Sequence, residues 1–284
     1  MKLKFLLFTS LIVFCLAGCS EMKTQPSTSI DSAAETSSST TEPTISTAPA
    51  TEAAPLPETL PTEPSLGISA GAYPQKYVNA ENGAYMEYYT FIPENATENM
   101  PLVIFLHGDG EVNRFSLLEN NDMMVNVREI YGDQFPFIVI SPCTRKESWI
   151  DWPIPDTLMK LIDQVVQTYS IDKEHIILTG HSRGAVGVWH MINNYGNYFS
   201  AAVPISCFCW KEFNMDTIIH VPIRAFCGTL ESYERSYNRL MREQVDEIVL
   251  AGGNAEFTLF DGASHSQTPA LSFTEELFQW ALSQ

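Results

Sequence analysis

Basic residues are scarce in this 284-residue chain, which has 16 Lys and Arg against 34 Asp and Glu and a formal net charge of −18. The deficit is not confined to one end, because residues 67–284 alone hold 13 basic and 27 acidic side chains. A protein that binds nucleic acid needs a basic surface to neutralise phosphates. We therefore expect no nucleic-acid partner.

The chain after residue 19 lacks long apolar runs, and its first part, residues 20–65, also lacks aromatic residues. After residue 19, no apolar run reaches the roughly 20 residues needed to span a bilayer. Residues 20–65 contain no Phe, Trp or Tyr, hold seven prolines and are rich in Ser and Thr. Such a segment cannot bury enough apolar surface to offset the entropy of ordering it, so we expect disorder there. The remaining residues are enough for a single domain.

The start of the chain has the pattern of an export signal. A basic start, Met1-Lys2-Leu3-Lys4, precedes an apolar run from Phe5 to Ala17 that is too short for a transmembrane helix. The run ends in Leu16-Ala17-Gly18-Cys19, which resembles the lipobox of bacterial lipoproteins. The alternative is an ordinary secretory signal in which Cys19 is incidental.

The lipobox resemblance implies an organisation in three parts. Residues 1–18 are a lipoprotein signal peptide, and lipidated Cys19 becomes the first residue of the mature protein. Residues 19–66 are then a disordered tether, and residues 67–284 are the folded domain. The domain is then held in the cell envelope, outside the cytoplasmic membrane, and touches that membrane only through its N-terminal lipid.

The domain has four cysteines, whose pairing the sequence leaves open. An exported protein permits disulfides, and four cysteines allow three pairings. Each cysteine nevertheless lies in or at the end of an apolar run, where a free thiol packs as a small hydrophobic group. No His or second Cys pair stands beside Cys207-Phe208-Cys209, so we expect no metal site. The four are Cys143, Cys207, Cys209 and Cys227.

Strand-like and helix-like segments alternate along the domain. This alternation predicts an α/β fold with a mostly parallel sheet and helices on both faces, whose ligands bind beyond the carboxyl ends of the strands. The expected strands are Tyr85–Ile92, Leu102–Leu106, Phe137–Ile140, Ile176–Leu178, Ala201–Ile205, Ile223–Phe226 and Phe257–Phe260. The expected helices are Thr157–Thr168, Gly184–Asn194, Tyr233–Leu250 and Thr274–Leu282.

A nucleophile motif joins one of these strands to the next helix. The segment Gly180-His181-Ser182-Arg183-Gly184 has the G-x-S-x-G pattern in the strand-to-helix context that the motif requires. A sharp turn lifts the Ser182 hydroxyl clear of the sheet, and the glycines permit close packing on either side. The helix amino terminus favours negative charge that develops there.

A serine nucleophile needs a base and an acid that orients it. His265 lies on the loop after Phe257–Phe260, and Glu231 is the first carboxylate after Ile223–Phe226. The resulting chain order of Ser, acid and His is that of G-x-S-x-G hydrolases. Glu234 is a competing acid close by, and Asp216 and Asp261 are more distant alternatives.

Three further residues are candidates for the surroundings of the nucleophile. The main-chain N–H groups of Arg183 and Asp109 are expected to form an oxyanion hole, Asp109 from the loop after Leu102–Leu106. The Arg183 side chain would favour an acidic substrate, or alternatively pair with a neighbouring carboxylate. Trp149 is a candidate substrate contact, as an apolar wall shared with Trp152, or alternatively a core residue.

The motifs together resemble a known family. Pro101–Gly108, Gly180–Gly184, Phe199–Ile205 and the closing segment from Ala251 to Trp280 are similar to α/β-hydrolase esterases of the polyhydroxybutyrate-depolymerase and feruloyl-esterase type. The resemblance implies an α/β-hydrolase fold and a serine esterase that acts on small-molecule or polymer-linked esters without metal or cofactor. The alternatives are a peptidase related to prolyl oligopeptidase and a non-catalytic binding lipoprotein that kept the fold.

The expected tether yields a first prediction. Deletion of residues 1–66 should leave a soluble, monomer-sized domain whose hydrolysis of small esters equals that of the full chain, because the removed segment buries nothing. Gel filtration and a p-nitrophenyl ester assay measure the two properties. Aggregation or lost activity of the truncated protein would show that the boundary or the disorder prediction is wrong.

Overall fold

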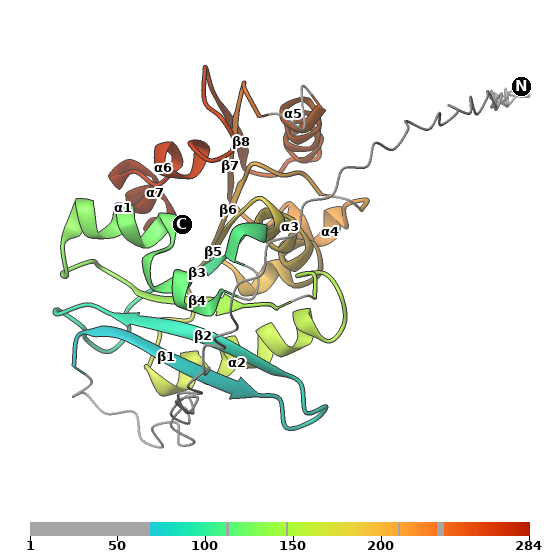
Figure 1. The fold of residues 1–284 in the computed structure, drawn as a ribbon. Helices are drawn as coiled ribbons and strands as arrows, with labels where there is room; N and C mark the ends of the chain where they lie inside the picture. The colour runs from blue at the N-terminus through green and yellow to red at the C-terminus, as the bar shows by residue number, and fades with distance from the viewer. Residues whose placement is uncertain (1–68, 112–113, 146, 210, 232–235) are drawn as a thin grey trace, which may run out of the picture. The chain divides into compact units, whose positions relative to one another are not determined.

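The computed structural model describes residues 69–284 except 112–113, 146, 210 and 232–235. The predicted signal peptide, Cys19 and the tether lie outside the described residues. Eight strands form one sheet in the order β1-β2-β4-β3-β5-β6-β7-β8 (Figure 1). The strands are β1 (Gly71–Val78), β2 (Tyr85–Ile92), β3 (Leu102–Leu106), β4 (Ile138–Cys143), β5 (Ile176–His181), β6 (Ala201–Ile205), β7 (Ile223–Gly228) and β8 (Ala255–Phe260).

Most of the sheet is parallel, as predicted. Strands β3 to β8 pair in parallel, whereas β1 and β2 form an antiparallel hairpin whose second strand pairs antiparallel to β4. Parallel neighbours need a crossover connection, which the intervening helices provide. All parallel strands therefore end at one edge of the sheet, where the loops that follow β3, β5, β7 and β8 meet.

Helices cover both faces of the sheet (Figure 1). One layer holds α2 (Ile154–Thr168), α3 (Arg183–Tyr195), α4 (Met215–Ile218) and α5 (Ser236–Leu250). The other holds α1 (Asp122–Tyr131), α6 (Thr268–Ser272) and α7 (Glu275–Leu282). Short 3-10 helices are η1 (Asp109–Glu111), η2 (Phe115–Asn120) and η3 (Gly196–Tyr198).

The fully buried strand β3 shows how one short segment serves both layers. Leu102, Ile104 and Leu106 belong to the core under α2 and α3. Val103 and Phe105 belong to the core under α1 and α7. Because successive strand side chains point to opposite faces, a continuous apolar run is what a strand between two helical layers requires.

Several elements differ from the sequence-based expectation. Strand β1 was not predicted, because it is an edge strand whose residues are largely exposed and include Pro74, so it lacks a regular apolar alternation. The helices α1, α4 and α6 were also not predicted. Helix α2 begins at Ile154 rather than Thr157. The first residues of the helix predicted from Tyr233 lie outside the described residues.

Two further findings concern membrane-spanning helices and the cysteines. Within residues 69–284, as far as they are described, no helix is long and apolar enough to cross a membrane. All four domain cysteines are buried, and the described part of the chain contains no disulfide between them. They pack as small apolar groups, which was one of the two interpretations left open.

Candidate active site

The turn between β5 and α3 has the geometry of a nucleophile elbow. Ser182 has a φ of 56° and a ψ of −118°, a strained conformation for a residue with a side chain. A Cβ on Gly184 would lie 1.8 Å from the Leu106 carbonyl oxygen, and one on Gly180 would lie 2.8 Å from it. Only glycine fits at either position, which gives the motif its physical basis.

The Ser182 side chain is left available by this turn. Ser182 is the N-cap residue of α3, yet its hydroxyl makes no capping hydrogen bond. Serine at this position usually caps the first turn through its oxygen. The Ser182 main-chain N–H instead donates to the Ile205 carbonyl on β6, at 2.8 Å, which anchors the elbow to the sheet.

The structure brings Glu231 and His265 together from two loops. His265 Nδ1 lies 2.8 Å from Glu231 Oε2. The two loops are joined by a hydrogen bond from the Leu230 N–H to the Ala263 carbonyl, at 2.9 Å. Because a carboxylate only accepts, Nδ1 carries the proton of this hydrogen bond, and Nε2 is the ring nitrogen on the side away from Glu231.

Glu231 is buried and fully supplied with donors. Its Oε1 accepts hydrogen bonds from Ser206 Oγ at 2.6 Å, Gly228 N at 2.7 Å and Thr268 Oγ1 at 2.8 Å. Burial alone raises the pKa of Glu231, but the hydrogen bonds from His265, Ser206, Gly228 and Thr268 outweigh burial and lower it to about 2. Glu231 is therefore ionised at neutral pH.

The competing acids have other surroundings. Asp261 is exposed, and its Oδ1 accepts a hydrogen bond from Thr229 Oγ1 at 3.3 Å. Asp216 lies in α4. Glu234 lies outside the described residues. Among the described carboxylates, Glu231 is the one bonded to His265.

The loop after β3 passes directly beside Ser182. A Cβ on Gly108 would lie 3.3 Å from Ser182 Cβ. Buried His107 holds this loop, because its Nδ1 lies 2.6 Å from the Gly108 carbonyl oxygen and its Nε2 accepts from the Thr144 N–H at 3.1 Å. Burial lowers the pKa of His107 to about 4, so the ring is neutral and donates through Nδ1. Asp109 follows as the first residue of η1.

The Arg183 side chain forms an ion pair rather than an open cationic site. Its Nε lies 3.0 Å from Asp109 Oδ1. The guanidinium also donates to Thr144 Oγ1 at 2.7 Å and to the Glu147 carbonyl at 3.1 Å. Of the two roles considered for this side chain, the structure shows the ion pair. Arg183 thereby links the elbow to the loops after β3 and β4.

Trp149 is a core residue, which corrects its expected role as a substrate contact. Its side chain is 1% exposed, and its Nε1 donates to the His107 carbonyl at 3.0 Å. The ring packs against α3 at Gly187, where an added Cβ would lie 2.7 Å from Trp149 Cβ. The neighbouring Trp152 is 78% exposed, so the two tryptophans do not form one wall.

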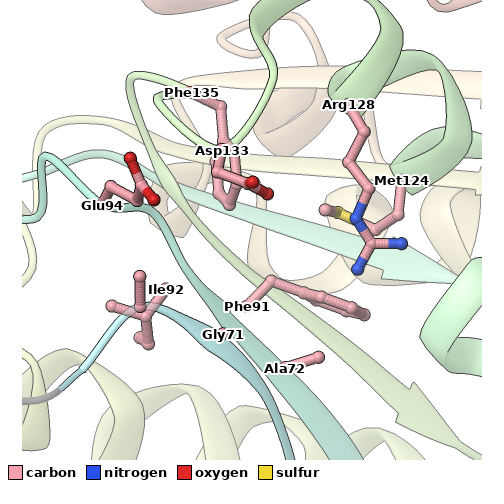
Figure 2. A pocket seen from close by; sticks show the side chains of 10 residues that line it. Gly71, Ala72, Phe91, Ile92, Glu94, Met124, Arg128, Asp133 and Phe135 are labelled. Carbon is pink, nitrogen blue, oxygen red and sulfur yellow. The ribbon is translucent and has the colours of Figure 1, made fainter.

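A cavity away from this site is shown in Figure 2. It has a volume of about 210 Å³ and lies among β1, β2, α1 and the segment that follows α1. The Arg128 guanidinium stacks over the Phe91 ring there, 5.7 Å from its centroid. None of the predicted site residues lines this cavity. The described residues also contain no cluster of His, Cys, Asp or Glu suited to a metal ion.

Sequence reasoning missed the residues that support Glu231 and the loop after β3. Ser206 and Thr268 bond Glu231, and His107 and Thr144 hold Gly108. Ser206 directly follows β6 and has a φ of 61°. A polar residue at the carboxyl end of a buried strand was the available signal for it. Nothing in the sequence marks Thr268, because its contact depends on the approach of α6 to β7.

Comparisons with known proteins identify the fold. No family model matches the chain. A bifunctional acetylxylan esterase/xylanase of Neocallimastix patriciarum is 28% identical over 131 residues, which is 44% of this chain and 18% of that protein. The chain therefore matches less than a fifth of this curated relative.

Solved structures match over a larger share of the chain. A thermostable esterase has a TM-score of 0.63 at 21% identity, covering 75% of this chain and 63% of that chain. Fluorophosphonate-binding serine hydrolase F of Staphylococcus aureus, with substrate bound, has a TM-score of 0.59 at 15% identity, covering 76% and 100%. With the strand order and the elbow, these likenesses show an α/β-hydrolase fold.

The low pKa of Glu231 predicts how stability depends on pH. An unfolded Glu titrates near 4.5 and the folded one near 2, so the stabilisation is complete above pH 4.5 and is lost as pH falls toward 2. Glu231→Gln should therefore reduce the fall in unfolding free energy between pH 6 and pH 2.5 by on the order of 2 kcal/mol.

Urea unfolding at the two pH values measures this effect. Glu129→Gln, which removes an exposed carboxylate on α1, is the matched control and should follow the wild type. Equal pH dependence of wild type and Glu231→Gln would contradict the depressed pKa.

Proposed function

We propose that this protein is a serine esterase that hydrolyses carboxylic esters through Ser182, His265 and Glu231. The observation that carries the proposal is the strained Ser182 on the β5–α3 turn, with His265 bonded to buried Glu231 on the neighbouring loops. The three residues come from separate parts of the chain and meet beyond the carboxyl ends of the parallel strands. The esterase relatives favour ester bonds as the substrate.

The chemistry follows from the tautomer of His265. Its Nδ1–H faces Glu231, so Nε2 accepts the Ser182 hydroxyl proton while Oγ attacks the ester carbonyl carbon. The tetrahedral intermediate expels the alcohol, which takes that proton from Nε2, and an acyl-enzyme remains. Water then attacks the acyl carbon and gives one proton to His265 Nε2. The second tetrahedral intermediate breaks its bond to Ser182 Oγ, which takes that proton back from Nε2, and the carboxylic acid leaves. Glu231 stays ionised throughout and stabilises the imidazolium.

The negative oxygen of each tetrahedral intermediate needs preorganised donors. We assign this role to the main-chain N–H groups of Arg183, at the start of α3, and of Asp109, in the loop after β3. The lack of a side-chain cap at Ser182 and the approach of Gly108 to the serine support the assignment. The ion pair between the two side chains links the segments that carry these amides.

Esters of plant polysaccharides are the first substrates to test. The curated relative is by name an acetylxylan esterase, and the sequence motifs resemble feruloyl esterases. A panel of p-nitrophenyl acetate, butyrate and octanoate with methyl ferulate and acetyl-xylan separates acyl from alcohol preference. Substantial activity on a single chain length would define the acyl site.

Removal of the nucleophile tests the mechanism. Ser182→Ala should lower kcat on p-nitrophenyl acetate by roughly 10⁴- to 10⁶-fold and leave folding intact, because the attacking atom is lost. A fluorophosphonate probe should label the wild type and not the variant. Circular dichroism checks the fold of both proteins. Hydrolysis close to the wild-type rate in Ser182→Ala would refute the proposed mechanism.

We further propose that the enzyme acts in the cell envelope, anchored through lipid on Cys19. The lipobox-like Leu16–Cys19 and the Ser/Thr/Pro-rich tether support this location. Cys19→Ser should move the protein from the membrane fraction to the soluble fraction in a bacterial host that processes lipoproteins, because no lipid can attach. Membrane retention of the variant equal to that of the wild type would contradict the anchor.

A further inference from the structure

The histidine before the nucleophile contacts the catalytic base of the proposed mechanism. His181 is the last residue of β5, and its ring lies against the His265 ring with 4.6 Å between the centroids and 41° between the planes. His181 Nε2 also lies 3.0 Å from the main-chain carbonyl oxygen of His265. One side chain therefore contacts both the ring and the backbone of His265.

The charge state of His181 determines the direction of that hydrogen bond. Burial lowers the pKa of His181 to about 4, an effect strengthened by His265 and opposed by Glu231 and by the bond to the His265 carbonyl. The ring is therefore neutral at pH 7 and has a single N–H. Because the carbonyl oxygen only accepts, that proton is on Nε2.

We propose that His181 is a positioning residue that holds His265 in line with Ser182, an inference that rests on the proposed esterase function. The hydrogen bond from His265 Nδ1 to Glu231 fixes one edge of the His265 ring and leaves rotation about that bond possible. The side chain of His265 is 35% exposed, so its outer face has no full packing layer. The His181 ring supplies a packed inner face, and its Nε2–H fixes the loop backbone.

The proposed proton transfer also favours a neutral side chain next to the His265 ring. His265 becomes a cation when it accepts the serine proton, and a cationic neighbour would oppose that step. Among the described residues, the ionised carboxylate of Glu231 interacts with both rings and favours that positive charge. A neutral imidazole therefore supplies the contact and the hydrogen bond without opposing the developing charge.

Three substitutions separate the hydrogen bond from the ring contact. Gln places an amide N–H near the position of the imidazole Nε2, Phe keeps a ring without a donor, and Ala removes both. We expect His181→Ala to lower kcat on p-nitrophenyl acetate roughly 10- to 100-fold with KM within about twofold, since misplacement of a reacting group costs this much. His181→Gln and His181→Phe should each recover part of the loss. His190→Gln, a half-buried histidine further along α3, is the control and should retain kcat.

Nuclear magnetic resonance of histidine-labelled protein provides a readout that does not require activity. In the wild type at pH 7, His181 should be neutral with its proton on Nε2, and the His265 ring protons should show a ring-current shift. That shift should disappear in His181→Ala and persist in His181→Phe. A merely structural role would lower the melting temperature without a loss of kcat per labelled active site.

The outcomes distinguish this proposal from the proposed function. An unchanged kcat in a folded His181→Ala variant, or a wild-type His181 that is cationic or protonated on Nδ1 at pH 7, would overturn the positioning role. If His181→Ala fails to fold, the tautomer of His181 in the wild type and the kcat values of His181→Gln and His181→Phe still test the positioning role. A wild type that neither hydrolyses esters nor accepts a fluorophosphonate at Ser182 would refute the esterase proposal itself, while the resonance measurements still test the contact.

Discussion

The close approach of the first turn of α3 to the carbonyl end of β3 is the constraint on which the rest of the site depends. Gly184 leaves no room for a side chain against the Leu106 carbonyl oxygen, so α3 begins directly over the sheet. The chain can then reach α3 from β5 only through a sharp turn, which places Ser182 at a positive φ. The strain in that turn is compensated by packing, because Trp149 and Leu106 fill the space against Gly187.

A second constraint is the burial of a charge. Glu231 has a side chain that is 3% exposed, which would be costly for a carboxylate without partners. Donors from β7 and α6 and from the residue after β6 all bond its Oε1, so the charge is stabilised in place. The loops that carry Glu231 and His265 are thereby tied to the sheet and to each other, and the other oxygen, Oε2, aligns His265.

The loop after β3 is organised by neutral and paired groups. His107 joins Gly108 to Thr144, and Arg183 joins Asp109 to the same Thr144. A cation at the elbow is thus used to hold loops together rather than presented to solvent. These contacts tie the loops around Ser182 together, which is what the proposed amide donors require if they are to stabilise a developing oxyanion without reorganisation.

The amino-acid sequence by itself determined strands β2 to β8 and the local geometry of the turn at Ser182. Continuous apolar runs such as Leu102–Leu106 specify strands between two layers, and Gly180 and Gly184 specify a close turn around Ser182. The order of the polar residues after the strands placed Glu231 and His265 on adjoining loops. Their mutual hydrogen bond could be anticipated because the carboxyl ends of parallel strands meet at one edge.

Only the tertiary structure decided which side chains support these residues. Whether Trp149 faced substrate or core depended on the position of α3, and whether Arg183 was free or paired depended on where Asp109 lay. The contacts of Ser206, Thr268 and His181 join segments that lie from 25 to 84 residues apart. Such contacts leave no periodic pattern in the sequence, because they depend on distances that exist only once the layers have packed.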